Sequence, residues 1–264
     1  MKSHGRRGLI RTREGFERLR RHFAREMARD RRLHRKALDL LVHADHYHWI
    51  QQTTWLGEPV LQLPEDLFLL QEIIFKTRPK FIIEVGVAWG GSLLFYSTLL
   101  EAVRKDGRII GIDVFVPPDL RRRVGAFGKI SQRIAWIEGS SMEEGVIRRM
   151  KRLLGNCREV MVHLDSNHTH EHVLRELRIY SQWVGKGYYL ICGDTVVEEI
   201  PPQRHRPRPW GPGNNPRTAL CQFLGENHRF EVDHQLENKL LFSCNPGGYL
   251  KCRRDGPLFF SWKS

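Results

Sequence analysis

From residue 79 onward, short apolar runs rich in β-branched residues alternate with segments of helical length, and this alternation restricts the fold of the 264-residue chain more than any other feature. Five such runs predict strands at 80–85, 108–113, 134–138, 160–165 and 188–192. Continuous apolar strands separated by helices are typical of a parallel sheet that is covered on both faces. The sequence therefore predicts an α/β fold with a doubly wound, Rossmann-like sheet.

The segments between and after these runs predict helices at 90–104, 142–154, 170–184 and 216–226. Two more strands are expected near 229–234 and 239–244. Because only a few residues separate them, we expect an antiparallel C-terminal hairpin that completes a mostly parallel, seven-stranded sheet at its edge.

The first 40 residues are strongly basic: they hold 14 Lys and Arg against 5 Asp and Glu, a net charge of +9 out of +13 for the chain. An apolar stripe with helical spacing predicts one helix over 12–42, and its members are Phe16, Leu19, Phe23 and Met27. We expect this stripe to pack on the body or on a second subunit rather than to bind a polyanion, since Arg-rich faces are often simply solvated. The predicted organisation is a basic helical extension at 1–50, an α/β domain at 51–264, and a homo-oligomer.

No membrane span or export signal is expected. No stretch approaches the roughly 18 apolar residues that a span requires, and the Arg6-Arg7 pair is not followed by an apolar segment. The five cysteines form no C-x-x-C pair, which suits a reducing compartment. The sequence therefore predicts a cytoplasmic protein.

The first predicted strand ends in a glycine-rich turn, Glu84-Val85-Gly86-Val87-Ala88-Trp89-Gly90-Gly91-Ser92. Ligands of open α/β sheets bind at the carboxyl ends of the strands, and glycines let the backbone turn sharply and approach a ligand there. The spacing differs from G-x-G-x-x-G, and an acidic Glu84 suits a cationic or hydroxyl-bearing ligand better than a pyrophosphate. We expect cofactor contacts from Glu84, Gly86, Val87, Ala88, Gly90 and Ser92.

The next two strand ends carry further cofactor candidates. Asp113 ends the second strand, where a carboxylate can hold a ribose diol. Ser140 and Ser141 follow the third strand, where an adenine edge would be recognised. In this order, the glycine loop, the ribose acid and the adenine-side turn resemble the class I S-adenosylmethionine-dependent methyltransferases, and the resemblance implies that cofactor.

Two carboxylates follow the fourth and fifth predicted strands, Asp165 and Asp194, and would lie at adjacent strand tips. Convergent carboxylates suit a hard cation such as Mg²⁺, which lowers the pKa of a bound hydroxyl. His168 would then remove the proton as a general base. Asp165 is also a candidate cofactor contact, and as an alternative it would cap the helix that begins near Thr169; its companion Asp194 favours the role of ligand.

Several motifs together resemble the cephalosporin hydroxylase and rhamnosyl O-methyltransferase family over roughly residues 50–252. Besides the glycine-rich turn, they are Trp55-Leu56-Gly57, Gln62-Leu63-Pro64-Glu65-Asp66, Gln71-Glu72-Ile73-Ile74, Leu164-Asp165-Ser166-Asn167-His168-Thr169, Glu171-His172-Val173-Leu174 and Asn245-Pro246-Gly247-Gly248-Tyr249-Leu250. The resemblance implies a class I S-adenosylmethionine-binding fold that is often oligomeric. Its characterised relatives act on sugar hydroxyls and antibiotic precursors.

The resemblance also bears on the metal. Related macrolide-sugar methyltransferases use Mg²⁺ and a histidine base, and Asp165 and His168 match the family's acid-x-x-His. The family's Glu-Asp pair after the fifth strand is here Gly193-Asp194. One expected ligand is therefore missing, which leaves three possibilities: Glu198 or Glu199 replaces it, water replaces it, or the site is free of metal.

The function predicted from the sequence is methylation of a hydroxyl on a small molecule, such as a sugar of a glycoconjugate or natural product. The insert at 201–216 would contact this substrate through a group of residues that includes Arg206, Arg208 and Trp210, together with Arg204 and His205. The alternatives are a nucleic-acid methyltransferase that uses the basic arm, which lacks a recognisable binding motif, and a binding protein without turnover.

An iron oxygenase is not expected. The H-x-D sequence of His163-Leu164-Asp165 occurs in iron sites, but that chemistry usually resides on a jelly roll.

Overall fold

A computed structural model of the chain describes residues 12–203 and 205–256. At its centre is a seven-stranded sheet with the order β5-β4-β3-β6-β7-β9-β8. The parallel strands are β3 (Phe81–Val85), β4 (Arg108–Asp113), β5 (Ile134–Glu138), β6 (Val160–Leu164) and β7 (Tyr189–Cys192). Antiparallel pairing joins β9 (Tyr249–Cys252) to β7 and to β8 (Phe230–Val232). The predicted doubly wound, mostly parallel sheet with an antiparallel edge is confirmed.

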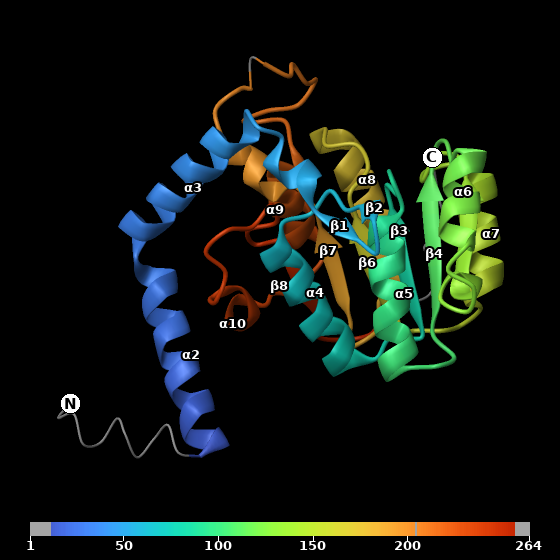
Figure 1. Ribbon diagram of the computed structural model, residues 1–264, viewed down its shortest axis with the longest axis horizontal. Helices are drawn as coiled ribbons and strands as arrows, with labels where there is room; N and C mark the ends of the chain where they lie inside the picture. Colours follow the sequence, from blue (N-terminus) through green and yellow to red (C-terminus); the bar gives the residue numbers. More distant parts are fainter. Residues whose placement is uncertain (1–11, 204, 257–264) are drawn as a thin grey trace.

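Helices cover both faces of this sheet (Figure 1). One apolar core joins the sheet to α4 (Pro64–Thr77), α5 (Gly91–Val103) and α6 (Pro118–Gly125). The other core joins it to α7 (Glu144–Leu154), α8 (His170–Tyr180) and α9 (Pro216–Glu226). The buried positions of α7 recur every three or four residues, so a single stripe faces the sheet. The sequence predicted four of these helices closely and omitted α4 and α6.

The predicted strand at 239–244 is wrong, because the seventh strand is β9. The backbone N–H of Phe242 donates to Glu65 and that of Cys244 to Asp66, both on α4. These side-chain acceptors replace the partners that a neighbouring strand would supply. The apolar residues of the segment pack against the helices, and the short helix α10 (His234–Glu237) stands between β8 and this segment.

The N-terminal arm consists of two helices, α2 (Arg13–Arg29) and α3 (Arg31–Asp45), where the sequence predicted one. Asp30 interrupts the arm with a ψ of 84°, and its carboxylate accepts a hydrogen bond from the backbone N–H of Leu33 to begin α3. Figure 1 shows α2 extending away from the body, and Phe16 and Phe23 of its stripe are about half exposed. Packing of the stripe on the body is therefore incomplete.

Smaller elements connect the arm to the sheet. The one-turn helix η1 (Trp49–Gln52) leads into a hairpin of β1 (Thr54–Trp55) and β2 (Glu58–Pro59). The hairpin lies so close to the start of α5 that a Cβ on Gly91 would be 2.4 Å from the carbonyl oxygen of Pro59. The remaining one-turn helices are η2 (Ser131–Arg133), η3 (Ser181–Trp183) and η4 (Thr195–Glu198).

Within the described ranges, no helix combines the length and the apolar character that crossing a membrane requires. All five cysteines are free thiols. Cys192 is completely buried and burial raises the pKa of its thiol, which agrees with a packing role rather than a nucleophilic one.

Candidate active site

A cavity of about 570 Å³ opens at the carboxyl ends of the parallel strands. Its lining contains His168, the metal candidates Asp165 and Asp194, the substrate candidates Arg206, Arg208 and Trp210, and every predicted cofactor residue except Gly90. His205 lies outside the lining. Gly90 instead has a φ of +79°, and a Cβ there would be 2.9 Å from a side-chain carbon of Leu120. Gly90 therefore lets the glycine loop turn and pack on α6.

The glycine loop is held tightly against the neighbouring strand. Gly86 has a φ of +91°, and a Cβ on it would be 2.1 Å from the carbonyl oxygen of Asp165. Only glycine satisfies both the backbone angle and this contact. The loop after β3 and the end of β6 thus form one continuous floor of the cavity.

Asp113, at the end of β4, organises the same loop. Its Oδ2 accepts hydrogen bonds from the backbone N–H groups of Val87 at 2.8 Å and Ala88 at 3.2 Å. Its Oδ1 accepts one from Phe115 at 3.3 Å. The residue predicted to bind ribose therefore also fixes the shape of the glycine loop, which the sequence alone did not indicate.

The two serines after β5 differ in their surroundings. Ser140 lines the cavity and is partly exposed. Ser141 also lines it, but its hydroxyl donates to Oε1 of the buried Glu176 at 2.5 Å, and its carbonyl accepts from Tyr180. Ser141 therefore ties the turn to α8, while Ser140 is free to face a ligand.

Beneath the cavity floor, Glu84 and His163 form a buried pair. The Glu84 carboxylate accepts from Ser92 at 2.7 Å and lies 3.8 Å from His163 Nδ1, which is 2.8 Å from the hydroxyl of Tyr96. Burial raises the pKa of Glu84, although His163 opposes this effect. The Nδ1 atom of His163 is thus engaged by Tyr96 and lies near Glu84.

Three predicted residues converge at the tips of β6 and β7. His168 Nδ1 lies 3.0 Å from Asp194 Oδ2, and His168 Nε2 lies 3.4 Å from Asp165 Oδ1. One ligand atom of each residue lies within 4.8 Å of the others. We call Asp165, His168 and Asp194 the acidic triad.

The charges of the acidic triad are strongly linked. Burial lowers the pKa of His168, but Asp194 and Asp165 outweigh it and raise that pKa to about 10. Burial raises the pKa of Asp194, but the facing His168 outweighs it and holds that pKa below its usual range. Without a bound cation, the two carboxylates favour the protonated form of His168.

The alternative role for Asp165 as a helix cap is wrong. Thr169 precedes α8 without a side-chain cap, and its backbone N–H donates to Asn167. The Asp165 carboxylate instead accepts a 2.7 Å hydrogen bond from the amide nitrogen of Gln62. It is therefore directed into the cavity.

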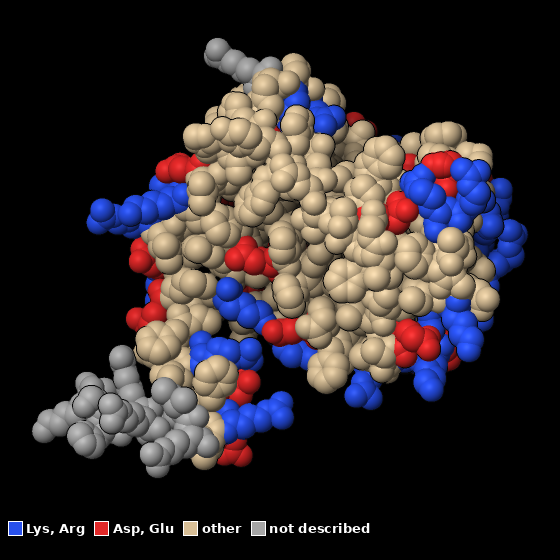
Figure 2. All heavy atoms as spheres, in the orientation of Figure 1, with Lys and Arg blue, Asp and Glu red and all other residues tan. Residues whose placement is uncertain are grey.

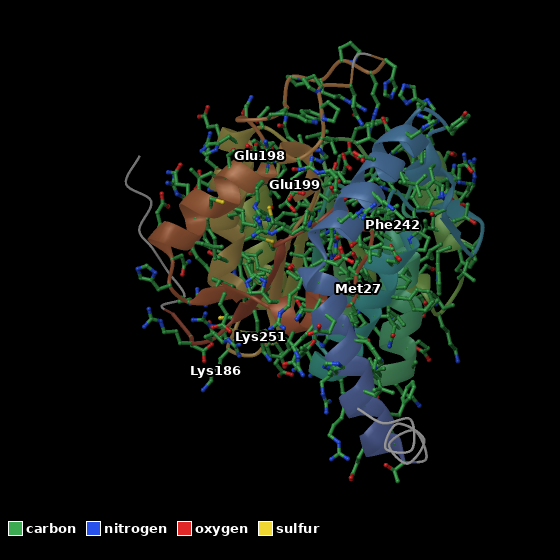
Figure 3. The ribbon with its side chains drawn as sticks, turned by 90° about the vertical axis from the view of Figure 1, so that its left-hand side faces the viewer. Met27, Lys186, Glu198, Glu199, Phe242 and Lys251 are labelled. Carbon is green, nitrogen blue, oxygen red and sulfur yellow. The ribbon has the colours of Figure 1, made fainter. Side chains whose placement is uncertain are left out.

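Gly193 leaves no room for a larger residue. A Cβ there would be 2.8 Å from Oδ1 of Asp165 and 2.8 Å from the carbonyl oxygen of Leu164. Neither Glu198 nor Glu199 replaces the missing carboxylate, because both lie beside α9 (Figure 3) and outside the cavity lining. Glu198 accepts instead from the backbone of Gly213 and the side chain of Asn215. The protein thus supplies two carboxylates, Asp165 and Asp194, to this end of the cavity.

The insert at 201–216 closes over the acidic triad. The Trp210 ring lies 4.9 Å from the His168 ring, and the Arg208 guanidinium lies 5.4 Å from the centre of Trp210. Arg206 also lines the cavity, but its guanidinium makes two hydrogen bonds to Asp45 of α3, at 2.7 and 3.2 Å. Arg204 lies outside the described residues.

Asp45 is a residue that the sequence analysis missed. It is 8% exposed and accepts further hydrogen bonds from Gln203 at 2.7 Å and His205 at 2.8 Å. The arm thereby becomes one wall of the cavity and anchors the insert. Beside this anchor, the rings of His46 and His205 are stacked with their centres 4.5 Å apart.

Comparisons with known proteins agree with this geometry. The model of the family described as Rhamnosyl O-methyltransferase/CmcI matches residues 47–253. The rhamnosyl O-methyltransferase of Mycobacterium tuberculosis is 24% identical over 216 residues, which cover 78% of this chain and 84% of the relative. That of Mycobacterium leprae is 26% identical over 169 residues, which cover 60% and 70%.

Two solved structures share the fold. CmcI, in a structure described as holding Mg and SAM, has a TM-score of 0.54 and 18% identity over 76% of this chain and 77% of that one. The O-methyltransferase TomG from Streptomyces achromogenes, in complex with SAM, has a TM-score of 0.50 and 14% identity over 74% and 79%.

The sheet order, the glycine loop and the family match define the class: the protein is a class I S-adenosylmethionine-dependent methyltransferase. More particularly, the chain belongs to the rhamnosyl O-methyltransferase/CmcI family. The cofactor and the family predicted from the sequence are thereby confirmed, and the alternative of a binding protein without turnover loses its support.

Proposed function

We propose that this chain transfers the methyl group of S-adenosylmethionine to a hydroxyl of a small molecule, a sugar of a glycoconjugate or natural product. The observation that carries the proposal is the acidic triad, which places a histidine between two carboxylates in the same cavity as the glycine loop. The printed names of the relatives, rhamnosyl O-methyltransferases, support a sugar as the acceptor.

The donor set of the acidic triad fits a divalent cation. Two carboxylates from adjacent strand tips converge, and hard cations such as Mg²⁺ prefer oxygen ligands and complete their shell with water. Asp165 and Asp194 would hold this cation. When bound, it would supply a Lewis acid that lowers the pKa of the acceptor hydroxyl.

His168 acts as the general base in this proposal. It accepts the proton of the hydroxyl while the oxygen bonds to the methyl carbon and the carbon–sulfur bond breaks, which releases S-adenosylhomocysteine. The imidazole must be neutral to do so. A cation bound by Asp165 and Asp194 would partly neutralise these carboxylates. They would then stabilise the imidazolium less, and the neutral form of His168 would be favoured.

The insert supplies the proposed acceptor contacts. Trp210 offers an aromatic face for the apolar side of a sugar ring, and Arg208 beside it offers hydrogen-bond donors. Arg206 supports this surface from behind through Asp45.

The distribution of charge favours a small acceptor over a nucleic acid. On the face drawn in Figure 2, basic side chains lie among acidic ones over α6 and along the arm, while the surface over α4 and α5 carries little charge. A duplex-binding enzyme would be expected to present a basic stripe that is continuous with its site.

The test is methyl transfer from S-adenosylmethionine to methyl rhamnoside, followed as S-adenosylhomocysteine release with Mg²⁺ or with a chelator. Wild-type protein and the control Asp119→Asn, at a partly exposed position of α6 outside the cavity lining, should turn over with Mg²⁺. Asp194→Asn should not. Turnover of Asp194→Asn at the wild-type rate, or no transfer to any hydroxylated sugar, would contradict the proposal.

A further inference from the structure

Gln62 lies between β2 and α4. Of its two side-chain amide atoms, Nε2 is hydrogen-bonded, and Oε1 has no hydrogen-bond partner among the described residues. The residue is 4% exposed, and its amide nitrogen donates to Asp165 Oδ2 at 2.7 Å. A carboxylate only accepts hydrogen bonds, so the amide cannot be flipped without facing oxygen to oxygen. The assignment of the two amide atoms is therefore fixed, and Oε1 is buried without a hydrogen-bond partner among the described residues.

A buried amide oxygen without a donor is destabilising, and native proteins rarely retain one without a reason. The Gln62 side chain lines the cavity beside Asp165. A molecule bound in the cavity would supply the missing donor. The position of Gln62 beside the tip of β6 then indicates which part of that molecule comes near.

The strand tips place the parts of S-adenosylmethionine in order. The adenine side is expected at Ser140 after β5 and the ribose at Asp113 after β4. The next two tips along the sheet are those of β3 and β6, where Gly86 contacts Asp165. The amino-acid part of the cofactor would therefore extend to these tips, and Gln62 stands there.

Apart from His168, the groups at this end of the cavity are acceptors: the carboxylate of Asp165 and the amide oxygen of Gln62, above the buried Glu84. An ammonium group has three N–H donors and no acceptor. We propose that Gln62 Oε1 accepts a hydrogen bond from the α-ammonium group of S-adenosylmethionine. The inference rests on the cofactor site of the proposed function and adds Gln62 as a binding residue for the amino-acid part.

The experiment compares two ligands by isothermal titration in the presence of a chelator, so that no cation contributes. S-adenosylhomocysteine carries the α-ammonium group, and methylthioadenosine lacks the whole amino-acid part. The variants are Gln62→Met, which has neither amide group, and Gln62→Glu, whose protonated form keeps both a donor toward Asp165 and an oxygen acceptor. Gln132→Met, at an exposed position of η2, is the matched control.

Gln62→Met should weaken the binding of S-adenosylhomocysteine by about tenfold or more, which is the effect of losing a hydrogen bond to a charged group. Its affinity for methylthioadenosine should stay close to that of the wild type, and Gln62→Glu should recover most of the lost affinity. Equal losses for both ligands, or no loss for either, would overturn the inference and leave the proposed function intact. Failure of the wild-type protein to bind either ligand would instead overturn the cofactor site itself.

Discussion

The two sides of the cavity are assembled in different ways. On the cofactor side, the Asp113 carboxylate accepts a hydrogen bond from Val87 of the glycine loop, and the two residues are 26 positions apart in the sequence. On the acceptor side, Asp45 is 160 residues from His205 and 161 from Arg206. The first side follows from consecutive strand-turn-helix units, whereas the second needs the arm and the insert to meet.

This difference teaches that cofactor binding and acceptor recognition have separate structural supports. Substitutions on the cofactor side should change the affinity for S-adenosylmethionine. Substitutions on the acceptor side should change turnover or the acceptor KM, because they alter the triad and the insert rather than the glycine loop.

The largest effect is expected at the triad. His168→Ala removes the proposed base and should reduce kcat by about a hundredfold to ten-thousandfold. The affinity for S-adenosylmethionine should stay near that of the wild type. Steady-state kinetics together with a cofactor titration check this, with His34→Ala on α3 as the control. A comparable loss of cofactor affinity would break the separation between the two sides.

Asp113→Ala tests the cofactor side. The substitution removes the acceptor for two N–H groups of the glycine loop as well as the proposed ribose contact. It should therefore weaken the binding of S-adenosylmethionine by about tenfold to a hundredfold. At saturating cofactor, kcat should fall much less. A variant that binds the cofactor normally and fails in turnover would show that the roles are not divided in this way.

Asp45→Asn tests the anchoring of the insert. Loss of the carboxylate weakens its bonds to Arg206, His205 and Gln203, so the acceptor KM should rise by roughly tenfold while cofactor affinity stays constant. Asp39→Asn, at an exposed position of the same helix, should change neither. A double variant with Arg206→Gln should be less than additive, because the two residues share one interaction.

The last prediction concerns the stability of the fold and neither side of the cavity. Burial raises the pKa of Glu237 to about 7, although N–H groups of Tyr249 and Gly247 oppose it. Because the folded pKa lies above the unfolded one, this carboxyl contributes stability that is complete below the unfolded pKa and is lost as pH rises through about 7.

Glu237→Gln should therefore flatten the fall in unfolding free energy between about pH 5 and about pH 8, by at most about 3 kcal/mol. Urea unfolding at several pH values measures this, and Glu231→Gln, at an exposed position of β8, is the control. An unchanged slope in Glu237→Gln would assign the pH dependence of stability to other groups.

The contrast between the sides also explains what the sequence predicted. Strand apolarity and the glycine loop are local patterns, so the parallel sheet, α9 and the position of Asp113 were predictable. The acidic triad was predictable because parallel strand tips meet at one edge of a sheet. These inferences need only the order of the strands.

Except for the break of the arm at Asp30, which is a local cap, the errors discussed here arise where distant polar groups decide the structure. The run at 239–244 has strand-like apolarity, but Glu65 and Asp66 of α4 bind its backbone N–H groups. The hydrogen bond of Gln62 to Asp165 and the anchoring of the insert by Asp45 join segments more than a hundred residues apart. The spacing of apolar residues in the sequence does not indicate which distant polar groups will pair, so these contacts are found only in the folded structure.

The most direct test of the account measures both sides of the cavity in one preparation: titration with S-adenosylmethionine and methyl transfer to methyl rhamnoside, each with Mg²⁺ and with a chelator. We predict cofactor binding under both conditions and methyl transfer with Mg²⁺ alone. Equal transfer in the chelator would contradict the assignment of Asp165 and Asp194 to a cation, and absence of cofactor binding under both conditions would contradict the account as a whole.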